Sequence, residues 1–242
     1  MENSTAKRKM SRRKKVVIAV IIIAGLTAII GGGIFYCTFF PNPFAKKIPV
    51  SDISAGVMSV TGGSNVLVAY FSLTNNRVYT ADEMDAVASA SLKVEDGIGY
   101  GHAELLAITA QEVTGGDIFP IKVNALYPET YGGAFDRHHS EMGTSMRLEL
   151  TEHLESVEIY DTVIIIYPNW LSSMPVPVFS FLEEYDFSGK TIIPIATSQA
   201  LGLGSGPEQI AAACPDAVVA DGLSAKSRDE VKDFLTKAGL AQ

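Results

Sequence analysis

From residue 65 onward, short apolar runs alternate with helical patterns. Five runs are the expected strands, at 66–71, 117–121, 162–167, 191–196 and 217–220. All but the second are continuous apolar or β-branched runs, which is typical of strands covered on both faces. The pattern therefore predicts a buried sheet rather than a sheet with one face in water.

Helical patterns lie between and after these runs, at 102–114, 141–156, 176–185, 207–213 and 228–238. The last has the clearest boundaries. Ser227 and Glu230 form a capping box, and Gly239 stands where a helix end favours a left-handed residue. Strands that alternate with helices in this way predict a parallel, doubly wound, five-stranded α/β sheet in one domain, 65–242.

The chain before this domain has a different composition. A basic cluster within residues 1–15 precedes the uncharged segment 16–40, which as a helix is long enough to cross about 30 Å of hydrocarbon. We expect a single-pass transmembrane helix in the cell membrane, with the N-terminus cytoplasmic and the domain extracytoplasmic. A cleaved signal peptide is the alternative, but its apolar region is usually shorter, about 7–15 residues. Residues 41–64 are expected to form a linker.

Charge is distributed unevenly along the chain. Seven of the 19 basic residues and one of the 27 acidic residues precede residue 46, which leaves 12 basic against 26 acidic residues, a formal charge of −14. Nucleic acid is a poor partner for such a domain, because neutralising phosphates needs clustered Lys and Arg. The negative charge of the domain would attract a redox protein partner with a basic docking surface. The alternative is that the charge only keeps the domain soluble.

Polar loops follow three of the expected strands. The carboxyl ends of parallel strands meet at one edge of the sheet, where open α/β sheets bind ligands. Hydroxyl and amide groups that suit a phosphate follow the first strand, at Ser72, Thr74, Asn75 and Asn76. The loop after the third strand holds the only tryptophan, within Pro168, Asn169, Trp170 and Leu171. The loop after the fourth strand adds Thr197, Ser198, Gln199 and Gly202.

Four motifs, taken together in this order, resemble the flavodoxin family. They are Tyr-Phe-Ser at 70–72, Tyr-Pro-Asn-Trp at 167–170, Phe-Leu-Glu at 181–183 and Phe-Ser-Gly-Lys-Thr at 187–191. The resemblance implies a flavodoxin-like fold with strand order 2-1-3-4-5 that holds FMN non-covalently. It implies a phosphate on the first loop and a flavin ring between the other two, with Trp170 as a flat stacking partner. The implied activity is electron transfer.

An insertion of about 24 residues, 78–101, separates the first loop from the helix that follows it. In one interpretation it splits the phosphate site, and the second half lies at the start of the helix, at Gly101, His102 and Ala103. In the other, Thr80 and Glu83 open a helix through residue 90, and the phosphate is held directly by Asn75 and Asn76. We favour the split site.

Two loop positions differ from the family pattern. Leu171 stands where the family usually has a second tryptophan, and residues 199–201 replace a glycine-rich stretch. The altered third loop and the long insertion favour one alternative function, a cofactor-free, membrane-tethered protein-binding module. A further alternative is a flavin-dependent reductase of a small acceptor such as a quinone. The adjacent His138 and His139 lack a spaced third metal ligand, and we expect them on the surface.

Overall fold

The computed structural model describes residues 47–57, 64–79, 83–85, 92–198 and 201–242. The expected transmembrane segment, 16–40, lies outside these residues. Within the described part of the chain, no helix is both long and apolar enough to cross a membrane.

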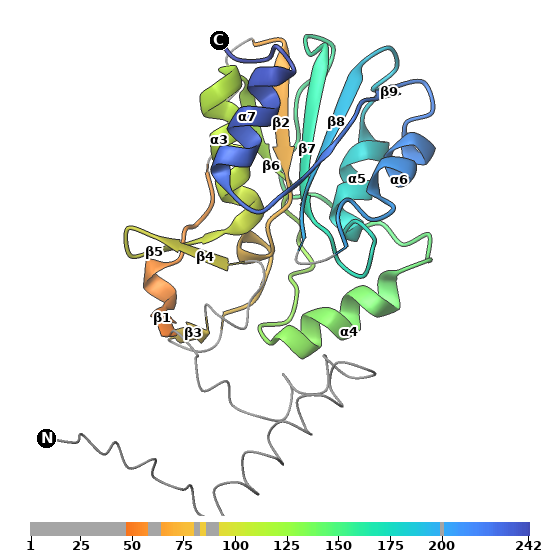
Figure 1. The fold of residues 1–242 in the computed structure, drawn as a ribbon. Helices are drawn as coiled ribbons and strands as arrows, with labels where there is room; N and C mark the ends of the chain where they lie inside the picture. The colour runs from red at the N-terminus through yellow and green to blue at the C-terminus, as the bar shows by residue number, and fades with distance from the viewer. Residues whose placement is uncertain (1–46, 58–63, 80–82, 86–91, 199–200) are drawn as a thin grey trace, which may run out of the picture. The chain divides into compact units, whose positions relative to one another are not determined.

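The core of the domain is a parallel sheet in the order β10-β8-β7-β2-β6 (Figure 1). Its main strands are β2 (Val66–Tyr70), β6 (Asp117–Pro120), β7 (Thr162–Pro168) and β8 (Thr191–Thr197). The fifth position is divided between two short strands, β9 (Val218–Val219) beside the start of β8 and β10 (Leu223–Ala225) beside its end. The sheet confirms the α/β class and, with β9 and β10 counted as one position, the predicted strand order.

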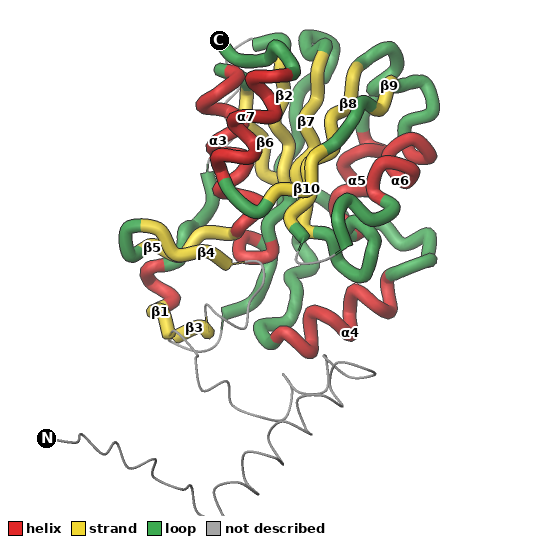
Figure 2. The backbone as a smooth tube through the Cα atoms, viewed as in Figure 1, coloured by secondary structure: helices red, strands yellow, loops and turns green. Residues whose placement is uncertain are grey.

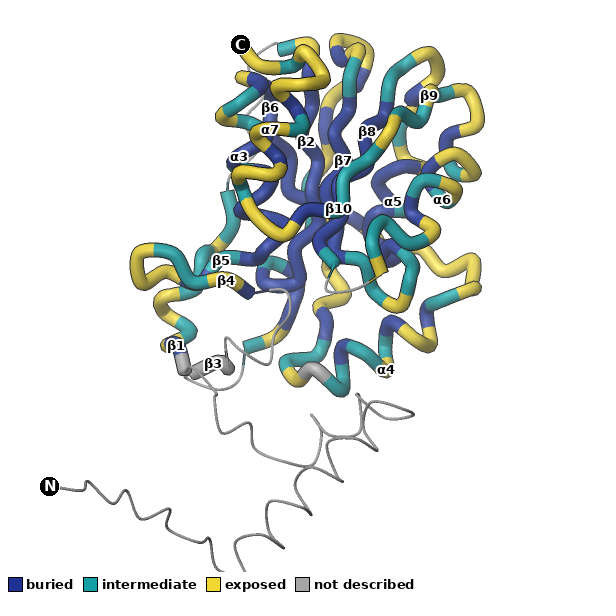
Figure 3. The backbone as a smooth tube through the Cα atoms, in the orientation of Figure 1, coloured by how far each residue is buried: buried dark blue, intermediate teal, exposed yellow. Residues whose placement is uncertain are grey.

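Alternate residues of each strand face opposite helical layers. In β2, one set packs toward α3 (His102–Thr114) and α7 (Arg228–Lys237), namely Val66, Val68 and Tyr70. The other set, Leu67 and Ala69, packs toward α5 (Val176–Glu184) and α6 (Gly206–Ala213), together with Phe71 directly after the strand. The central strands β2, β6, β7 and β8 are therefore buried along nearly their whole length, as Figure 3 shows, which explains the continuous apolar runs.

The helix expected at 141–156 is wrong. The helix of this region is α4 (Tyr131–Glu141), and the segment after it folds as turns and loop (Figure 2). Thr130 caps α4 by accepting a hydrogen bond from the N–H of Gly133 at 3.1 Å. Two glycines in the first turn weakened the helical pattern here, since glycine is a poor helix former. Apolar residues that suggested a helix instead pack on the core from the loop, at Leu150, Leu154 and Val157.

The expected cap of the last helix is present in modified form. The Ser227 side chain accepts a hydrogen bond from the N–H of Glu230 at 3.3 Å. The Glu230 carboxylate accepts from the N–H of Lys226, one residue before the cap, at 2.7 Å. Gly239 has a φ of 76°, the left-handed conformation predicted for it.

The insertion contains strands. β3 (Glu83–Asp85) pairs antiparallel with β1 (Lys47–Pro49), and β4 (Leu92–Glu95) forms a hairpin with β5 (Ile98–Gly101). Asp96 and Gly97 turn this hairpin with φ values of 50° and 84°, as a two-residue type I′ turn requires. The helix that Thr80 and Glu83 were expected to open is therefore wrong at 83–85, while residues 80–82 and 86–91 lie outside the described residues.

Part of the expected linker is built into the domain, whose compact unit begins at residue 46. The segment 47–57 contains β1 and the short helix η1 (Val50–Asp52). Ser54 donates its backbone N–H to the carbonyl oxygen of Gly99 at 2.7 Å and its hydroxyl to Glu104 Oε1 at 2.6 Å. This segment therefore packs against both the inserted hairpin and the first turn of α3.

Candidate functional site

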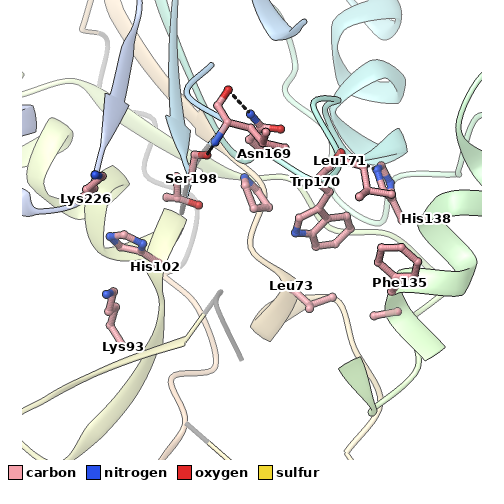
Figure 4. A pocket seen from close by; sticks show the side chains of 14 residues that line it. Leu73, Lys93, His102, Phe135, His138, Asn169, Trp170, Leu171, Ser198 and Lys226 are labelled. Carbon is pink, nitrogen blue, oxygen red and sulfur yellow. Dashed lines mark hydrogen bonds between the residues drawn. The ribbon is translucent and has the colours of Figure 1, made fainter. Parts of the chain in front are cut away.

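A cleft of about 470 Å³ opens at the carboxyl ends of the central strands (Figure 4). The loops after β7 and β8 form much of its wall, with Pro168, Asn169, Trp170, Leu171, Thr197, Ser198 and Leu201. Helix α4 adds Ala134, Phe135 and His138. The remaining lining residues are Leu73, Lys93, His102 and Lys226. Three of the regions predicted from sequence therefore meet at one site, although Gln199 lies outside the described residues.

The first loop meets the start of α3, as the split-site interpretation predicts. A Cβ atom at Gly101 would overlap Ser72 Oγ and lie 2.5 Å from Thr74 Oγ1, so only glycine allows this approach. The two hydroxyl oxygens are 2.6 Å apart and hydrogen-bonded to each other, and both residues are buried. Neither they nor Ala103 line the cleft.

Asn76 holds the first loop to its neighbours rather than facing a ligand. Its amide group donates to the carbonyl oxygens of Ser72 and Ile121 at 2.8 and 3.0 Å, and its side-chain oxygen accepts from the N–H of Val123 at 2.9 Å. The side chain is fully buried. Neither Asn76 nor Asn75 is among the residues that line the cleft.

The loop after β7 closes in a tight turn. Trp170 and Ser173 exchange backbone hydrogen bonds of 3.0 and 2.9 Å. Between them, Leu171 and Ser172 have φ values of 50° and 70°, the left-handed conformation that a type I′ turn needs and that non-glycine residues rarely adopt. Such strained backbone is concentrated at functional sites. Here it places Leu171 on the cleft wall.

Trp170 is a half-buried, well-supported part of the wall. Its ring meets those of Phe71, Tyr127 and His138 edge to face, at centroid distances of 5.7, 5.5 and 5.2 Å. His138 Nε2 also lies 3.0 Å from the carbonyl oxygen of Trp170. These contacts hold the indole in one orientation beside the cleft.

Helix α4 is fixed under the aromatic wall by a buried carboxylate. Glu141 accepts hydrogen bonds from Arg137 Nε at 2.6 Å and from the Tyr127 hydroxyl at 3.0 Å, and the Arg137 guanidinium lies 4.1 Å from the Tyr127 ring centroid. The expectation that His138 lies on the surface is wrong, because it is buried against Trp170, whereas His139 is exposed. Burial lowers the pKa of His138.

The second and third loops are tied together by Asn169. Its backbone N–H donates to the carbonyl oxygen of Thr197 at 2.8 Å, and its side-chain amide donates to that of Gly202 at 2.8 Å. Gly202 therefore supports the site through its carbonyl group without lining the cleft. Asn169 Oδ1 is buried and has no hydrogen-bond partner in the described structure.

The cleft has chemically different ends (Figure 4). Lys93, His102 and Lys226 lie at one side, and the aromatic residues lie at the other. Burial and the charge of Lys93 lower the pKa of His102 to about 4, against a hydrogen bond with the Lys226 backbone that raises it. Among the described lining residues there is no carboxylate. Sequence reasoning missed both lysines and Phe135, because no motif marks them.

A model of the flavodoxin family matches residues 101–238, more than half of the chain. The chain belongs to the flavodoxin family. The match begins at the last residue of the insertion, and it includes α3, α4 and the loops after β7 and β8. These elements form most of the cleft.

Solved structures share this flavodoxin fold. A provisionally assigned flavoprotein from Bacteroides uniformis is 26% identical to the chain, with a TM-score of 0.56, and the match covers 72% of this chain and 99% of that protein. A second one, from Bacteroides eggerthii, is 23% identical, with a TM-score of 0.55, and the match covers 72% of this chain and 98% of that protein. A flavoprotein in complex with FMN from Lactobacillus acidophilus is 13% identical, with a TM-score of 0.50, and covers 72% of the chain and 97% of itself. No curated protein sequence matches the chain.

The residues of this flavodoxin cleft fit a flavin, the cofactor that the family suggests. Trp170 offers an aromatic surface for a flat ring, and the lysine end suits an anion. Asn169 Oδ1 and His138 Nδ1 are buried without hydrogen-bond partners in the described structure. Buried polar atoms normally have partners, and the polar edge of a flavin would supply them.

Proposed function

We propose that this protein is a membrane-anchored flavodoxin that binds FMN in the cleft and transfers electrons. One observation carries the proposal: an aromatic wall and a basic end share one cleft at the carboxyl edge of a flavodoxin sheet. A ligand with a flat ring and an anionic tail matches both ends. When bound, FMN supplies the redox chemistry, and the protein supplies binding, orientation and electrostatics.

The protein residues would act on the bound group in two ways. Trp170, supported by Phe71 and Tyr127, would shield one face of the ring from water. The acidic domain, with 12 basic against 26 acidic residues, would oppose added negative charge on the flavin ring, at the end of the cleft away from the lysines. Both effects disfavour the reduced, more negative form and lower the reduction potential.

The sequence supports a membrane anchor and a basic protein partner. The basic residues within 1–15 and the apolar segment 16–40 fit a single-pass anchor with the N-terminus in the cytoplasm and the domain outside it. An acidic domain fits a redox protein with a basic docking surface. Protease treatment of intact cells should cleave the domain if it is extracytoplasmic.

Flavin titration tests the central claim. The full chain, purified in mild detergent, should quench the fluorescence of added FMN and elute yellow from a size-exclusion column. A folded protein that stays colourless at saturating FMN would overturn the proposal and leave a cofactor-free protein-binding module. Sustained oxidation of NAD(P)H with a quinone by the FMN-loaded protein alone would instead identify a reductase of small acceptors.

A further inference from the structure

We propose that this chain recognises the phosphoryl group of the flavin through Lys93 and Lys226, beside His102, rather than through the hydroxyl groups of Ser72 and Thr74. The inference rests on the proposed function and specifies how its site works. It assigns ligand contacts to two residues that lie outside the first loop.

The hydroxyl groups of the first loop are already bonded and covered. Ser72 and Thr74 are 2% and 4% exposed, and their oxygens share a 2.6 Å hydrogen bond. Gly101 lies so close above them that a Cβ atom there would overlap Ser72 Oγ. A phosphoryl oxygen could reach these groups only if the start of α3 moved away.

The start of α3 also carries an internal acceptor. Glu104 Oε2 accepts the N–H of Gly101 at 3.2 Å, and Oε1 accepts the hydroxyl of Ser54 at 2.6 Å. The Glu104 side chain is 0% exposed. A carboxyl group thus occupies a backbone donor that a helix N-terminus would otherwise offer to an anion. One fewer backbone donor therefore remains at this helix start, which favours a contribution from other groups to anion binding.

Two lysine side chains supply the missing charge. Lys93 comes from β4 in the insertion, Lys226 follows β10, and both are exposed. In the part of the chain that the structure describes, neither ammonium group forms an ion pair, whereas Lys122, Arg137, Arg147 and Arg228 do. The two lysines share a cleft whose described lining residues include no carboxylate, so positive charge is concentrated here in a domain with 26 acidic and 12 basic residues. They mark this end of the cleft as a site for an anion.

The two lysines converge on His102. All three residues line the same cleft, and the charge of Lys93 is one cause that lowers the pKa of the His102 ring. Figure 4 shows the three side chains at the end of the cleft away from Trp170. A ligand whose ring rests near Trp170 would direct an anionic tail toward them. A phosphate monoester carries close to two negative charges at pH 7, which two ammonium groups can neutralise.

The test compares FMN with riboflavin, which has the same ring and no phosphate. Lys93→Gln and Lys226→Gln are made in the full chain, singly and together, and Kd is measured for both flavins by fluorescence quenching. Each substitution should weaken FMN binding roughly tenfold, as expected for a charged hydrogen bond, and leave riboflavin binding within twofold. The salt dependence of FMN binding should become shallower in the double variant.

Two further variants serve as controls. Lys237→Gln removes an exposed charge at the end of α7, far from the lining residues, and should change neither affinity. Ser72→Ala with Thr74→Ala should leave the ratio of FMN to riboflavin affinity unchanged. Three results would overturn the inference. The lysine variants could bind FMN as tightly as the wild type, or they could lose affinity for both flavins equally. The hydroxyl variant could also be the only one that loses affinity for FMN but not for riboflavin. A wild-type protein that binds neither flavin overturns the proposed function instead.

Discussion

Gly101 and Ser72 approach so closely that a Cβ atom on the glycine would overlap the serine hydroxyl oxygen. The two residues are separated by the whole insertion in sequence. Their contact joins the first loop to the start of α3 and buries the hydroxyl pair of Ser72 and Thr74. Substitutions at this contact should therefore affect folding before they affect ligand binding.

Gly101→Ala should destabilise the domain by about 1–3 kcal/mol, because an added methyl group in a packed site forces neighbouring atoms to shift. Urea unfolding followed by tryptophan fluorescence measures the change. Adding Ser72→Ala removes the overlapping oxygen, although Thr74 Oγ1 remains 2.5 Å away. The double variant should thus lose less than the sum of the single losses. Strictly additive losses would show that the two residues do not meet.

Trp170→Ala should weaken FMN binding by about 1 kcal/mol for the lost ring contact, roughly fivefold in Kd, in addition to the loss of buried area. Flavin fluorescence titration measures it. Trp170→Phe retains an aromatic ring on the wall and should lose less. Riboflavin should lose as much as FMN, because the indole lies at the end of the cleft away from the lysines. An unchanged Kd for the alanine variant would place the flavin elsewhere.

Acid should destabilise the protein partly through His102. The unfolded chain protonates this ring below about pH 6.5, whereas the folded protein does so only near pH 4. Since the unfolded state binds more protons between these values, stability is full above pH 6.5 and falls as the pH drops toward 4. At pH 5 the loss is on the order of 2 kcal/mol.

The variant His102→Asn, which keeps a hydrogen-bond donor, isolates this effect. Urea midpoints at pH 7.5 and pH 5 should differ less for the variant than for the wild type. The exposed His139 provides the matched control, and His139→Asn should keep the wild-type difference. Equal acid sensitivity of the wild type and the His102 variant would mean that the ring is not buried as a neutral group.

Ser54→Ala should cost about 1–3 kcal/mol of stability, because it leaves Glu104 Oε1 without its hydroxyl donor in a buried site. Ser51→Ala is the control, since that hydroxyl bonds only to the adjacent, exposed Asp52 and its loss should cost under about 0.5 kcal/mol. Chemical unfolding measures both. Indistinguishable stabilities would show that the hydrogen bond from Ser54 to Glu104 adds nothing measurable to the stability of the domain.

Apolar runs located the strands well because every central strand is covered on both faces. The bounds of α3 agree with the prediction, and Gly115 ends it with a φ of 60°. Helix α4 escaped prediction because Gly132 and Gly133 weaken its local pattern, and its place depends on tertiary contacts such as that of Tyr127 with Glu141. The divided fifth strand was also beyond a pattern based on continuous runs.

The sequence predicted those parts of the site whose positions follow from the strand topology. Strand ends brought Trp170 and Asn169 to the right edge of the sheet, because parallel strands end together. The direction of a side chain cannot be predicted from topology. Asn76, for example, forms hydrogen bonds with backbone groups of its neighbours. Lys93 and Lys226 reach the cleft from an insertion and from beyond the fifth strand, and nothing in their local sequence indicates a shared position.

The carboxyl group of Glu104 limits where the chain can be shortened without loss of a buried hydrogen bond. It accepts hydrogen bonds from Ser54, in the segment ahead of the sheet, and from Gly101, the residue that caps the helix bordering the cleft. A fragment that started at the first central strand would carry every recognisable motif and still lack one of those donors. The smallest independent piece should accordingly begin no later than residue 46, where the compact unit begins.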